Sequence, residues 1–412
     1  MGARRPVILG WDLVSPLGTE LNDQWARTLA GESGVGPLTR FNPPEGFPVT
    51  IAGQVPELDV SDYPFLSPRR LALWPSPIFK HSLLVVHRAL KHSGLEITKE
   101  IAPEIGVTFS PAVGGLDAVL SADRVLMNEG RLPKPYVNPN SCINMVTGKV
   151  SILTGAAGPN LSTVTACATG STSLVVGAIM IASGMAKAFI CGGVDFPLVE
   201  PIVAGFATMN GAYKAGEPEP PERASRPFSK NRRGFVVSEG AACLILADPE
   251  FAHTHGLTPI AELAGWFMNS DAGHFVAPSL PTVTRCMAGA IEHAGIEPAD
   301  VDAVNAHATS TKVGDQVEAE ALKTVFGRNV PPVYANKSQI GHSMGAAAAI
   351  ESIWAIKGLV QGVIPPTINL DPDPDLGLEC LSERMLGIDQ EFVLKNAFGF
   401  GGTNCCIVLR RL

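Results

Sequence analysis

The feature that most constrains the fold is an alternation of short apolar runs with longer stretches of helical character. Residues 7–10, 187–193 and 241–246 are such apolar runs, bounded by Gly or Asp as buried strands tend to be. Residues 214–229, rich in Pro, Glu and Gly, predict a surface loop between the last two runs. Because continuously apolar strands are covered on both faces, the alternation predicts an α/β fold in which sheets lie between layers of helices.

The alternation is interrupted once, near residue 250. A polar stretch at 248–258 resembles a connector, after which a strand pattern restarts at 259–264 and a helix pattern follows at 282–294. We therefore expect two related halves, residues 1–250 and 251–412, although the sequence contains no strict repeat.

The composition argues against two broad classes of function. The 412 residues are 46% hydrophobic and 17% charged, with a formal net charge of -8. A nucleic-acid-binding protein normally carries a basic patch, so we expect no nucleic-acid partner, although a local patch could still dock an acidic protein. The longest apolar stretch, 174–186, is shorter than the roughly 20 residues that cross a bilayer. It therefore predicts a buried helix and no membrane association, and the absence of a signal-peptide pattern makes the cytoplasm the expected location.

The cysteine pattern indicates no metal site. None of the eight cysteines forms a CxxC pair or has zinc-site spacing with histidine, so most are expected to be buried free thiols. Cys167 differs because it lies between the end of a predicted strand and the start of the helix pattern at 171–185. The helix dipole and the unpaired N–H groups there favour a thiolate and could stabilise an oxyanion. Taken alone, a buried structural cysteine is the commoner outcome.

Two histidines and a lysine occupy similar strand and turn ends. His307 directly follows a short apolar strand, at the edge of the sheet where ligands bind in α/β folds. Lys337 and His342 flank a glycine turn at a helix start, and Glu351 lies in that helix where an ion pair with Lys337 could form. The alternatives are a core histidine, a solvated lysine and a helix-capping histidine.

A glycine-rich turn near the C-terminus carries two aromatic residues, Phe398 and Phe400, and leads into a strand. A structural turn is the default for this pattern, but two aromatics in so flexible a segment could form a movable gate. Phosphate binding is disfavoured because no P-loop Lys-Ser/Thr follows the glycines.

Together these segments closely resemble the β-ketoacyl-acyl carrier protein synthases, the elongating type I/II condensing enzymes of the thiolase superfamily. Two active-site histidines fit the elongating branch, since the initiating branch carries His and Asn. The resemblance implies a thiolase-like layered αβαβα fold built from two related halves. It is carried over nearly the whole chain by Thr165-Ala-Cys-Ala-Thr169, Asn305-Ala-His-Ala-Thr-Ser-Thr311, Lys337 with Gly341-His342, Phe398-Gly-Phe-Gly-Gly-Thr-Asn404, Arg226-Pro-Phe-Ser-Lys230, Gly234-Phe-Val-Val-Ser-Glu-Gly240 and Pro365-Pro-Thr-Ile-Asn369.

The resemblance also implies a mechanism. Cys167 would take an acyl group from a carrier-protein thioester, with the N–H groups of Cys167 and Phe400 as oxyanion hole. His307 and His342 would hydrogen-bond the carbonyl of a malonyl thioester and stabilise the enolate formed as its carboxylate is lost. Attack of that carbanion on the acyl-cysteine would give a 3-oxoacyl product two carbons longer. No resident cofactor is implied, because the phosphopantetheine arm arrives on the carrier protein, and a homodimer is expected from the family.

Further roles follow for the remaining residues of the motifs. They are Lys337 as organiser of the histidine pair, Glu351 as its support, Thr309 and Thr311 as contacts to the phosphopantetheine arm, Phe398 as a substrate contact, Phe400 as gate, and Val113 as lining of the acyl pocket.

Departures from the family pattern leave the pathway open. Ala308 replaces a usual Gly, Lys312 a usual Pro, and Asn336 a usual Thr, while residues 229–233 are more basic than usual. None removes a reacting group, but each could shift substrate choice, so a polyketide or other secondary-metabolite synthase remains the alternative to fatty-acid elongation.

Two other functions are less well supported. Silent partners of the chain-length-factor kind typically lack the nucleophilic cysteine. A thiolase acting on coenzyme A thioesters would need a second cysteine as base, and Cys405 and Cys406 are expected to miss the site because they follow Asn404 into a strand.

Overall fold

The computed structural model describes residues 5–214 and 219–412. Two segments lie outside the described residues. They are residues 1–4, where the sequence begins without a signal-peptide pattern, and residues 215–218 of the predicted surface loop. The described remainder of that loop includes a 3₁₀ turn at Pro221–Arg223.

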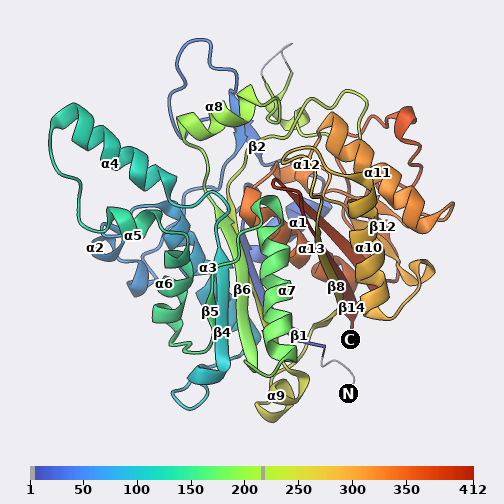
Figure 1. Cartoon of the computed structure of the whole chain (residues 1–412), viewed down its shortest axis with the longest axis horizontal. Coiled ribbons are helices and arrows are strands. Elements are labelled where there is room, and N and C mark those ends of the chain that lie inside the picture. Colours follow the sequence, from blue (N-terminus) through green and yellow to red (C-terminus); the bar gives the residue numbers. More distant parts are fainter. Residues whose placement is uncertain (1–4, 215–218) are drawn as a thin grey trace.

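Ten strands share one hydrogen-bonded sheet and fall into two sets of five (Figure 1). The first set runs in the order β5 (Asn160–Leu161), β4 (Ile105–Ser110), β6 (Ala188–Asp195), β7 (Gly240–Ala247) and β1 (Val7–Val14). The second runs in the order β10 (Val333–Tyr334), β9 (Ala303–Asn305), β13 (Phe392–Gly399), β14 (Thr403–Arg411) and β8 (Ala261–Ser270). In each set the first three strands are parallel to one another and the last two pair antiparallel. The sets therefore have the same topology, and they join where β1 pairs with β8.

Two buried helices lie between the two sets of strands. They are α7 (Thr169–Ala182) and α13 (Ala347–Gln361), which pack against each other and against strands of both sets. Most residues of both helices are buried, and only their C-terminal turns reach solvent, as expected of helices that pack on several sides. They supply the central part of the largest hydrophobic cluster, together with inward-facing side chains of the strands.

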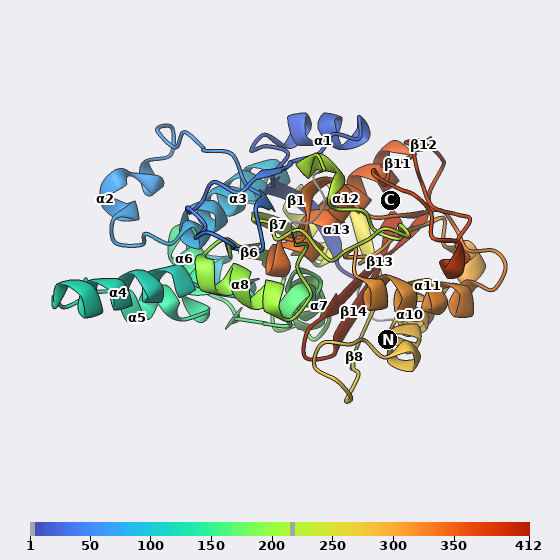
Figure 2. The same cartoon turned by 90° about the horizontal axis from the view of Figure 1, so that it is seen from above.

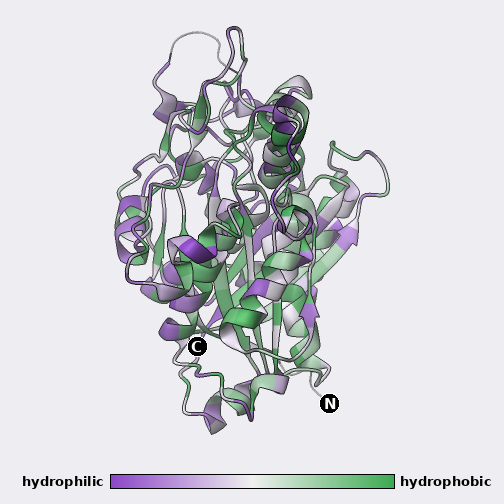
Figure 3. Ribbon diagram, turned by 90° about the vertical axis from the view of Figure 1, so that its left-hand side faces the viewer, coloured by the Kyte–Doolittle hydropathy of each residue, from purple (hydrophilic) through white to green (hydrophobic). Residues whose placement is uncertain are grey.

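The outer faces of the strands are covered by further helices. On the first set lie α3 (Pro77–Ser93) and α6 (Asn144–Thr154), and next to the second set lie α10 (Leu280–Ala294) and α11 (Lys312–Phe326). Figure 3 shows the sheet as predominantly hydrophobic between these layers. The helix, sheet, helix, sheet, helix layering confirms the predicted α/β class and the thiolase-like fold.

The remaining elements connect these layers or project from them. The helices are α1 (Leu21–Leu29), α2 (Pro68–Leu71), α4 (Leu116–Glu129), α5 (Val137–Ser141), α8 (Glu200–Thr208), α9 (Pro249–Thr254) and α12 (Lys337–Ile340). The short strands are β2 (Val35–Pro37), which pairs with β3 (Ile51–Gly53), and β11 (Val363–Ile364), which pairs with β12 (Leu386–Gly387). Helices α4 and α5 extend away from the body of the molecule (Figure 2). None of the helices formed by the described residues is long and apolar enough to cross a membrane.

Two local predictions need refinement. The polar stretch at 248–258 is not only a connector, because Asp248 accepts hydrogen bonds from the N–H groups of Glu250 and Phe251 and so caps the short helix α9. The sequence after Gly314 and Asp315 predicts a helix from about residue 316. Helix α11 instead begins at Lys312, because the Thr311 side chain accepts the N–H of Gly314 and caps the helix one turn earlier.

Candidate active site

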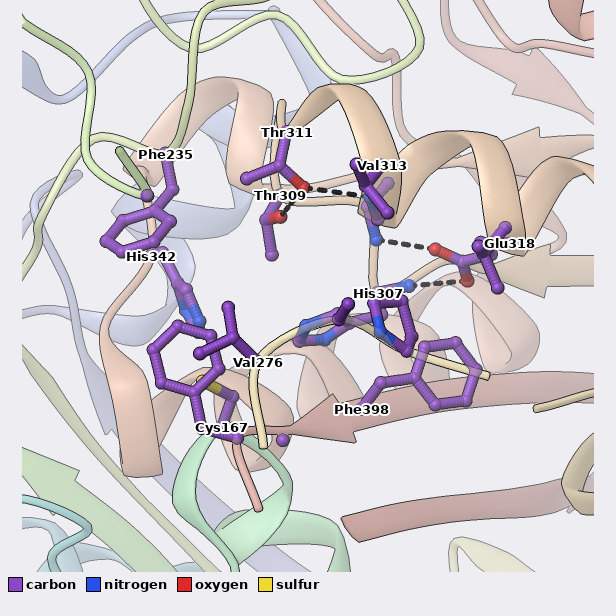
Figure 4. A pocket seen from close by; sticks show the side chains of 18 of the residues that line it. Cys167, Phe235, Val276, His307, Thr309, Thr311, Val313, Glu318, His342 and Phe398 are labelled. Carbon is purple, nitrogen blue, oxygen red and sulfur yellow. Dashed lines mark hydrogen bonds between the residues drawn. The ribbon is translucent and has the colours of Figure 1, made fainter. Parts of the chain in front are cut away.

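Residues from both halves line one cavity of about 420 Å³. The residues that the sequence places there and the structure brings together are Cys167, His307, Thr309, Thr311, His342, Phe398 and Phe400. Figure 4 shows Cys167 at one end of the cavity, His307 beside Phe398 on one side, and His342 beside Phe235 on the other. Thr309 and Thr311 lie at the end away from Cys167 in this view. Val113, Lys337 and Glu351 do not line the cavity.

Cys167 lies in a 3₁₀ turn, Ala166–Ala168, that runs directly into α7. Its neighbour Ala166 has φ of 49°, a left-handed conformation that costs energy for a residue with a side chain. The turn touches the glycine-rich segment, since a Cβ on Gly399 would meet the Thr165 carbonyl oxygen at 2.3 Å. Glycine at this position therefore allows the glycine-rich segment to approach the backbone beside Cys167.

Opposing effects act on the Cys167 thiol. Burial raises its pKa to about 11, while the Lys337 ammonium and hydrogen bonds from the N–H groups of Phe400 and Cys167 itself act to lower it. The sequence predicts a position that favours the thiolate; the N–H groups are in place, but burial has the larger effect. The N–H groups of Phe400 and Cys167 are also the two that the family resemblance assigns to an oxyanion hole.

His307 is held through its backbone. Its N–H donates to Glu318 Oε1 at 2.9 Å, and its carbonyl oxygen accepts a hydrogen bond from Lys337 Nζ at 2.7 Å. The N–H of Ala308 donates to the other Glu318 oxygen at 2.7 Å. Burial, followed by the Lys337 charge, holds the pKa of His307 well below its usual value, so the ring is neutral at physiological pH.

The His342 ring makes aromatic contacts, but its nitrogens have no hydrogen-bond partner among the described residues. Its backbone N–H donates to the Val236 carbonyl at 2.8 Å, and its ring lies edge-on to Phe235 and to His307, with centroid distances of 5.4 and 5.6 Å. Burial also holds the pKa of His342 well below its usual value. Within the described part of the chain neither ring nitrogen has a hydrogen-bond partner, although both are buried. A ligand oxygen in the cavity would satisfy one of them.

The expected ion pair between Lys337 and Glu351 is present, with Nζ and Oε1 2.5 Å apart and both side chains buried. Lys337 contacts the site through the His307 carbonyl and does not line the cavity.

The other predicted residues take distinct places. The hydroxyls of Thr309 and Thr311 are 3.1 Å apart on the cavity wall. Val113 packs in the same apolar cluster as Cys167, and its N–H donates to Asp195 Oδ1 at 3.0 Å. Cys405 and Cys406 are buried in β14 and do not line the cavity. Among the described residues, no group of three or more His, Cys, Asp or Glu is arranged to hold a metal ion.

Three buried charged residues were not found from the sequence. Asp195 accepts the N–H groups of Ala112, Val113 and Gly345, Glu318 holds the His307 turn, and Lys395 donates to Glu351. The available signal was a charged side chain inside or ending an apolar strand, as with Lys395 in the Phe392–Gly399 strand and Asp195 after 188–194.

A cysteine at the start of a buried helix, opposite two neutral histidines in a layered fold of two equivalent half-sheets, defines a condensing enzyme of the thiolase-like class. The chain belongs to the β-ketoacyl synthase family. The family model of the β-ketoacyl synthase N-terminal domain matches residues 3–252, and that of the C-terminal domain matches residues 260–371. The protein is therefore an acyltransferase.

Named relatives and solved structures agree with this assignment. The chain is 38% identical to a 3-oxoacyl-[acyl-carrier-protein] synthase 2 of Coxiella burnetii and 35% identical to one of Vibrio harveyi, each over the full length of both chains. A β-ketoacyl synthase from Burkholderia phymatum superposes with a TM-score of 0.91 at 28% identity, covering 99% of this chain and 100% of that one. A type II polyketide-synthase ketosynthase, solved with its acyl-carrier protein and bound to the hexaketide, superposes with a TM-score of 0.90 at 27% identity over the full length of both.

Proposed function

We propose that this protein elongates acyl chains by two carbons, condensing malonyl-acyl carrier protein with an acyl group held on Cys167. The observation that carries the proposal is the convergence of Cys167, His307 and His342 on one buried cavity. A silent partner would not need this set of reactive groups. Full-length relatives named 3-oxoacyl-[acyl-carrier-protein] synthase 2 support fatty-acid elongation as the setting.

In the first half-reaction the Cys167 sulfur attacks the thioester carbonyl of an acyl carrier protein. The carbonyl oxygen takes the electron pair and is stabilised by the N–H groups of Cys167 and Phe400. The bond to the carrier's sulfur then breaks. The carrier's sulfur leaves with the proton that the Cys167 thiol gives up, so no proton is gained or lost overall.

In the second half-reaction a malonyl thioester enters with its carbonyl oxygen towards His307 and His342. The bond to its carboxylate breaks, carbon dioxide leaves, and the electron pair forms an enolate whose oxygen accepts the two imidazole N–H groups. The enolate carbon attacks the acyl carbon on Cys167 and breaks the carbon–sulfur bond, and the released sulfur takes up one proton. Neutral imidazoles donate more strongly to the enolate than to the starting carbonyl, which lowers the barrier.

The supporting residues act around these steps. Lys337, paired with Glu351, fixes the His307 carbonyl, and the hydroxyls of Thr309 and Thr311 contact the incoming phosphopantetheine arm. Phe398 packs against His307, with ring centroids 5.6 Å apart. Phe400, next to the flexible glycines, gates entry, and Val113 belongs to the apolar cluster that contains Cys167.

The partners proposed are an acyl carrier protein and a second copy of the chain, with activity in the cytoplasm and no resident cofactor. The solved complex of a related ketosynthase with its carrier protein supports the first partner. An edge strand supports the second: β5 ends the ten-stranded order, and the side chains of Ile152 and Val164 near it are exposed.

A polyketide ketosynthase is the second candidate. It is favoured by the likeness to the polyketide-synthase ketosynthase. The two candidates differ in their products, because a fatty-acid synthase releases the chain after one condensation for reduction, whereas a polyketide synthase condenses repeatedly without it.

The decisive experiment is mass spectrometry of the intact protein after incubation with an acyl-carrier thioester. We expect an acyl adduct on the wild-type protein that is absent from Cys167→Ala. No adduct on the wild type, or an undiminished adduct on the variant, would contradict the proposed function.

A further inference from the structure

Lys395 is a fully buried cation that the mechanism above does not use. It lies on β13 within an otherwise apolar run, with none of its side chain exposed. Its Nζ donates to Glu351 Oε2 at 2.6 Å and to the Asn396 carbonyl oxygen at 2.5 Å. A buried ammonium is costly unless it is paired and hydrogen-bonded, so its place beside the catalytic support calls for a physical reason.

Glu351 joins Lys395 to the catalytic histidine on one side. One Glu351 oxygen accepts Lys395 and the other accepts Lys337, so the carboxylate bridges β13 and α12. Lys337 in turn donates to the carbonyl oxygen of His307. Lys395 therefore reaches the peptide unit that follows His307 through two consecutive ion pairs.

A second series of hydrogen bonds connects Lys395 to the backbone N–H of His307. Asn396, whose carbonyl accepts Lys395, donates its side-chain N–H to Glu318 Oε1 at 3.0 Å. Glu318 accepts the N–H groups of His307 and Ala308. The four buried charges, two ammonium and two carboxylate groups, thus balance and close a ring of hydrogen bonds around the backbone of His307.

We propose that Lys395 is a positioning residue for the decarboxylation half-reaction, completing a charge-balanced ring that fixes the peptide units on both sides of His307. The inference rests on the proposed function. Without Lys395, Glu318 and Glu351 would share one cation, and Glu351 would no longer be held from β13.

The electrostatics of the site agree with this role. The Lys395 charge acts to lower the pKa of both His307 and His342, and so helps keep them neutral hydrogen-bond donors. Burial is the main cause of the lowered pKa of Lys395 itself, followed by the opposing effect of Glu351. The titratable groups that interact with Lys395 or its carboxylate partner are Glu351, Lys337, Glu318, His307, His342, Cys405 and Tyr334.

The test compares Lys395→Met with the wild type in two assays: acyl-adduct formation by mass spectrometry and carbon dioxide release from malonyl-acyl carrier protein. We expect adduct formation close to wild type and carbon dioxide release slower by about 10- to 100-fold, as for a misplaced catalytic group. Removing one positive charge raises the pKa of the histidines, so the acidic limb of the decarboxylation pH profile should move to higher pH.

Two further variants make the result decisive. Lys395→Gln keeps a side chain that can donate to Glu351 but carries no charge. If the Met variant does not fold, the Gln variant tests the role of the Lys395 charge in the same two assays. Lys357→Met is the matched control, because Lys357 is a largely buried lysine on the same helix as Glu351 with its ammonium over the Trp25 ring. The control should retain the wild-type rate and pH profile.

The outcomes separate the two proposals. If the wild-type protein releases carbon dioxide and a folded Lys395 variant does so at the same rate and with the same pH profile, the role of Lys395 alone is overturned. A wild-type protein that releases no carbon dioxide would contradict the proposed function and the Lys395 role with it.

Discussion

The loops that follow β4 and β9 occupy equivalent places in the two halves, and each is anchored by one buried carboxylate on two consecutive N–H groups. After β4, Asp195 accepts the N–H groups of Ala112 and Val113, both at 3.0 Å. After β9, Glu318 accepts those of His307 and Ala308. The same backbone arrangement therefore holds a loop of the apolar cluster that contains Cys167 in one half and a cavity-lining histidine in the other.

The two carboxylates differ in how their charge is compensated. Burial raises the pKa of Asp195 to about 6, and the groups that oppose it are backbone N–H groups, of Val113, Gly345, Ala112 and Gly114. Burial also raises the pKa of Glu318, but there the Asn396 side chain and the Lys337 charge assist the N–H groups. Backbone dipoles are enough to hold the first loop, whereas the second half brings buried cations close to the histidines that we propose to stabilise an enolate.

The largest expected effect separates the chemistry of the two halves. His307→Ala and His342→Ala should still form the acyl adduct but lose about 10²- to 10³-fold in carbon dioxide release, because each removes one donor to the enolate. Cys167→Ala should do the reverse, losing the adduct while decarboxylation continues. Normal carbon dioxide release by both histidine variants would show that the division of labour is wrong.

Because only backbone N–H groups compensate the Asp195 carboxylate, its raised pKa predicts that the stability of the N-terminal half depends on pH. Asp195 has a folded-state pKa of about 6 against a reference value of 3.8, so the folded protein keeps its proton longer than the unfolded chain. Its contribution to stability is therefore present below about pH 4 and is lost as the pH rises to about 6, on the order of 2–3 kcal/mol. Asp195→Asn should lack this slope in denaturant unfolding measured across that range. Parallel stability curves for the two proteins would refute the prediction.

Replacing each of the two carboxylates, Glu318 and Asp195, by an amide should affect a different half-reaction. Glu318→Gln should slow carbon dioxide release by about tenfold and leave acylation nearly intact, since it loosens only the His307 turn. Asp195→Asn should instead impair acyl-adduct formation, because it loosens the loop that carries Val113. Equal effects of both variants on both half-reactions would mean that the halves are not functionally distinct.

The smallest expected effect lies at the end of the cavity away from Cys167. Thr309→Ala and Thr311→Ala should each raise KM for a carrier-borne substrate by about fivefold, the value of one hydrogen bond of about 1 kcal/mol. Acylation by a short synthetic thioester without the phosphopantetheine arm serves as the control and should be unchanged. An equal rise in KM for both substrates would assign the hydroxyls to the acyl group instead of the arm.

Much of the fold follows from local pattern. The runs at 187–193 and 241–246 become β6 and β7, and the helix pattern at 282–294 becomes most of α10, because their apolar periodicity matches what is buried. The boundary near residue 250 stays a prediction, supported by the identical strand order on its two sides. The start of α11 was misplaced by about a turn because the capping role of Thr311 depends on its side-chain contact, which no periodicity reveals.

The motif residues Cys167, His307, His342 and Phe400 could be picked out from the sequence because reactive groups beside strand ends and glycine turns leave a local signature. The Lys337–Glu351 ion pair was expected, but only the tertiary structure decided the rest of their support. Glu318 and Lys395 are 77 residues apart in sequence and are joined by Asn396, and Asp195 crosses to Gly345 in the other half. Such contacts form only when the two half-sheets close around α7 and α13, since burying a charge is tolerable only where partners from distant segments meet it.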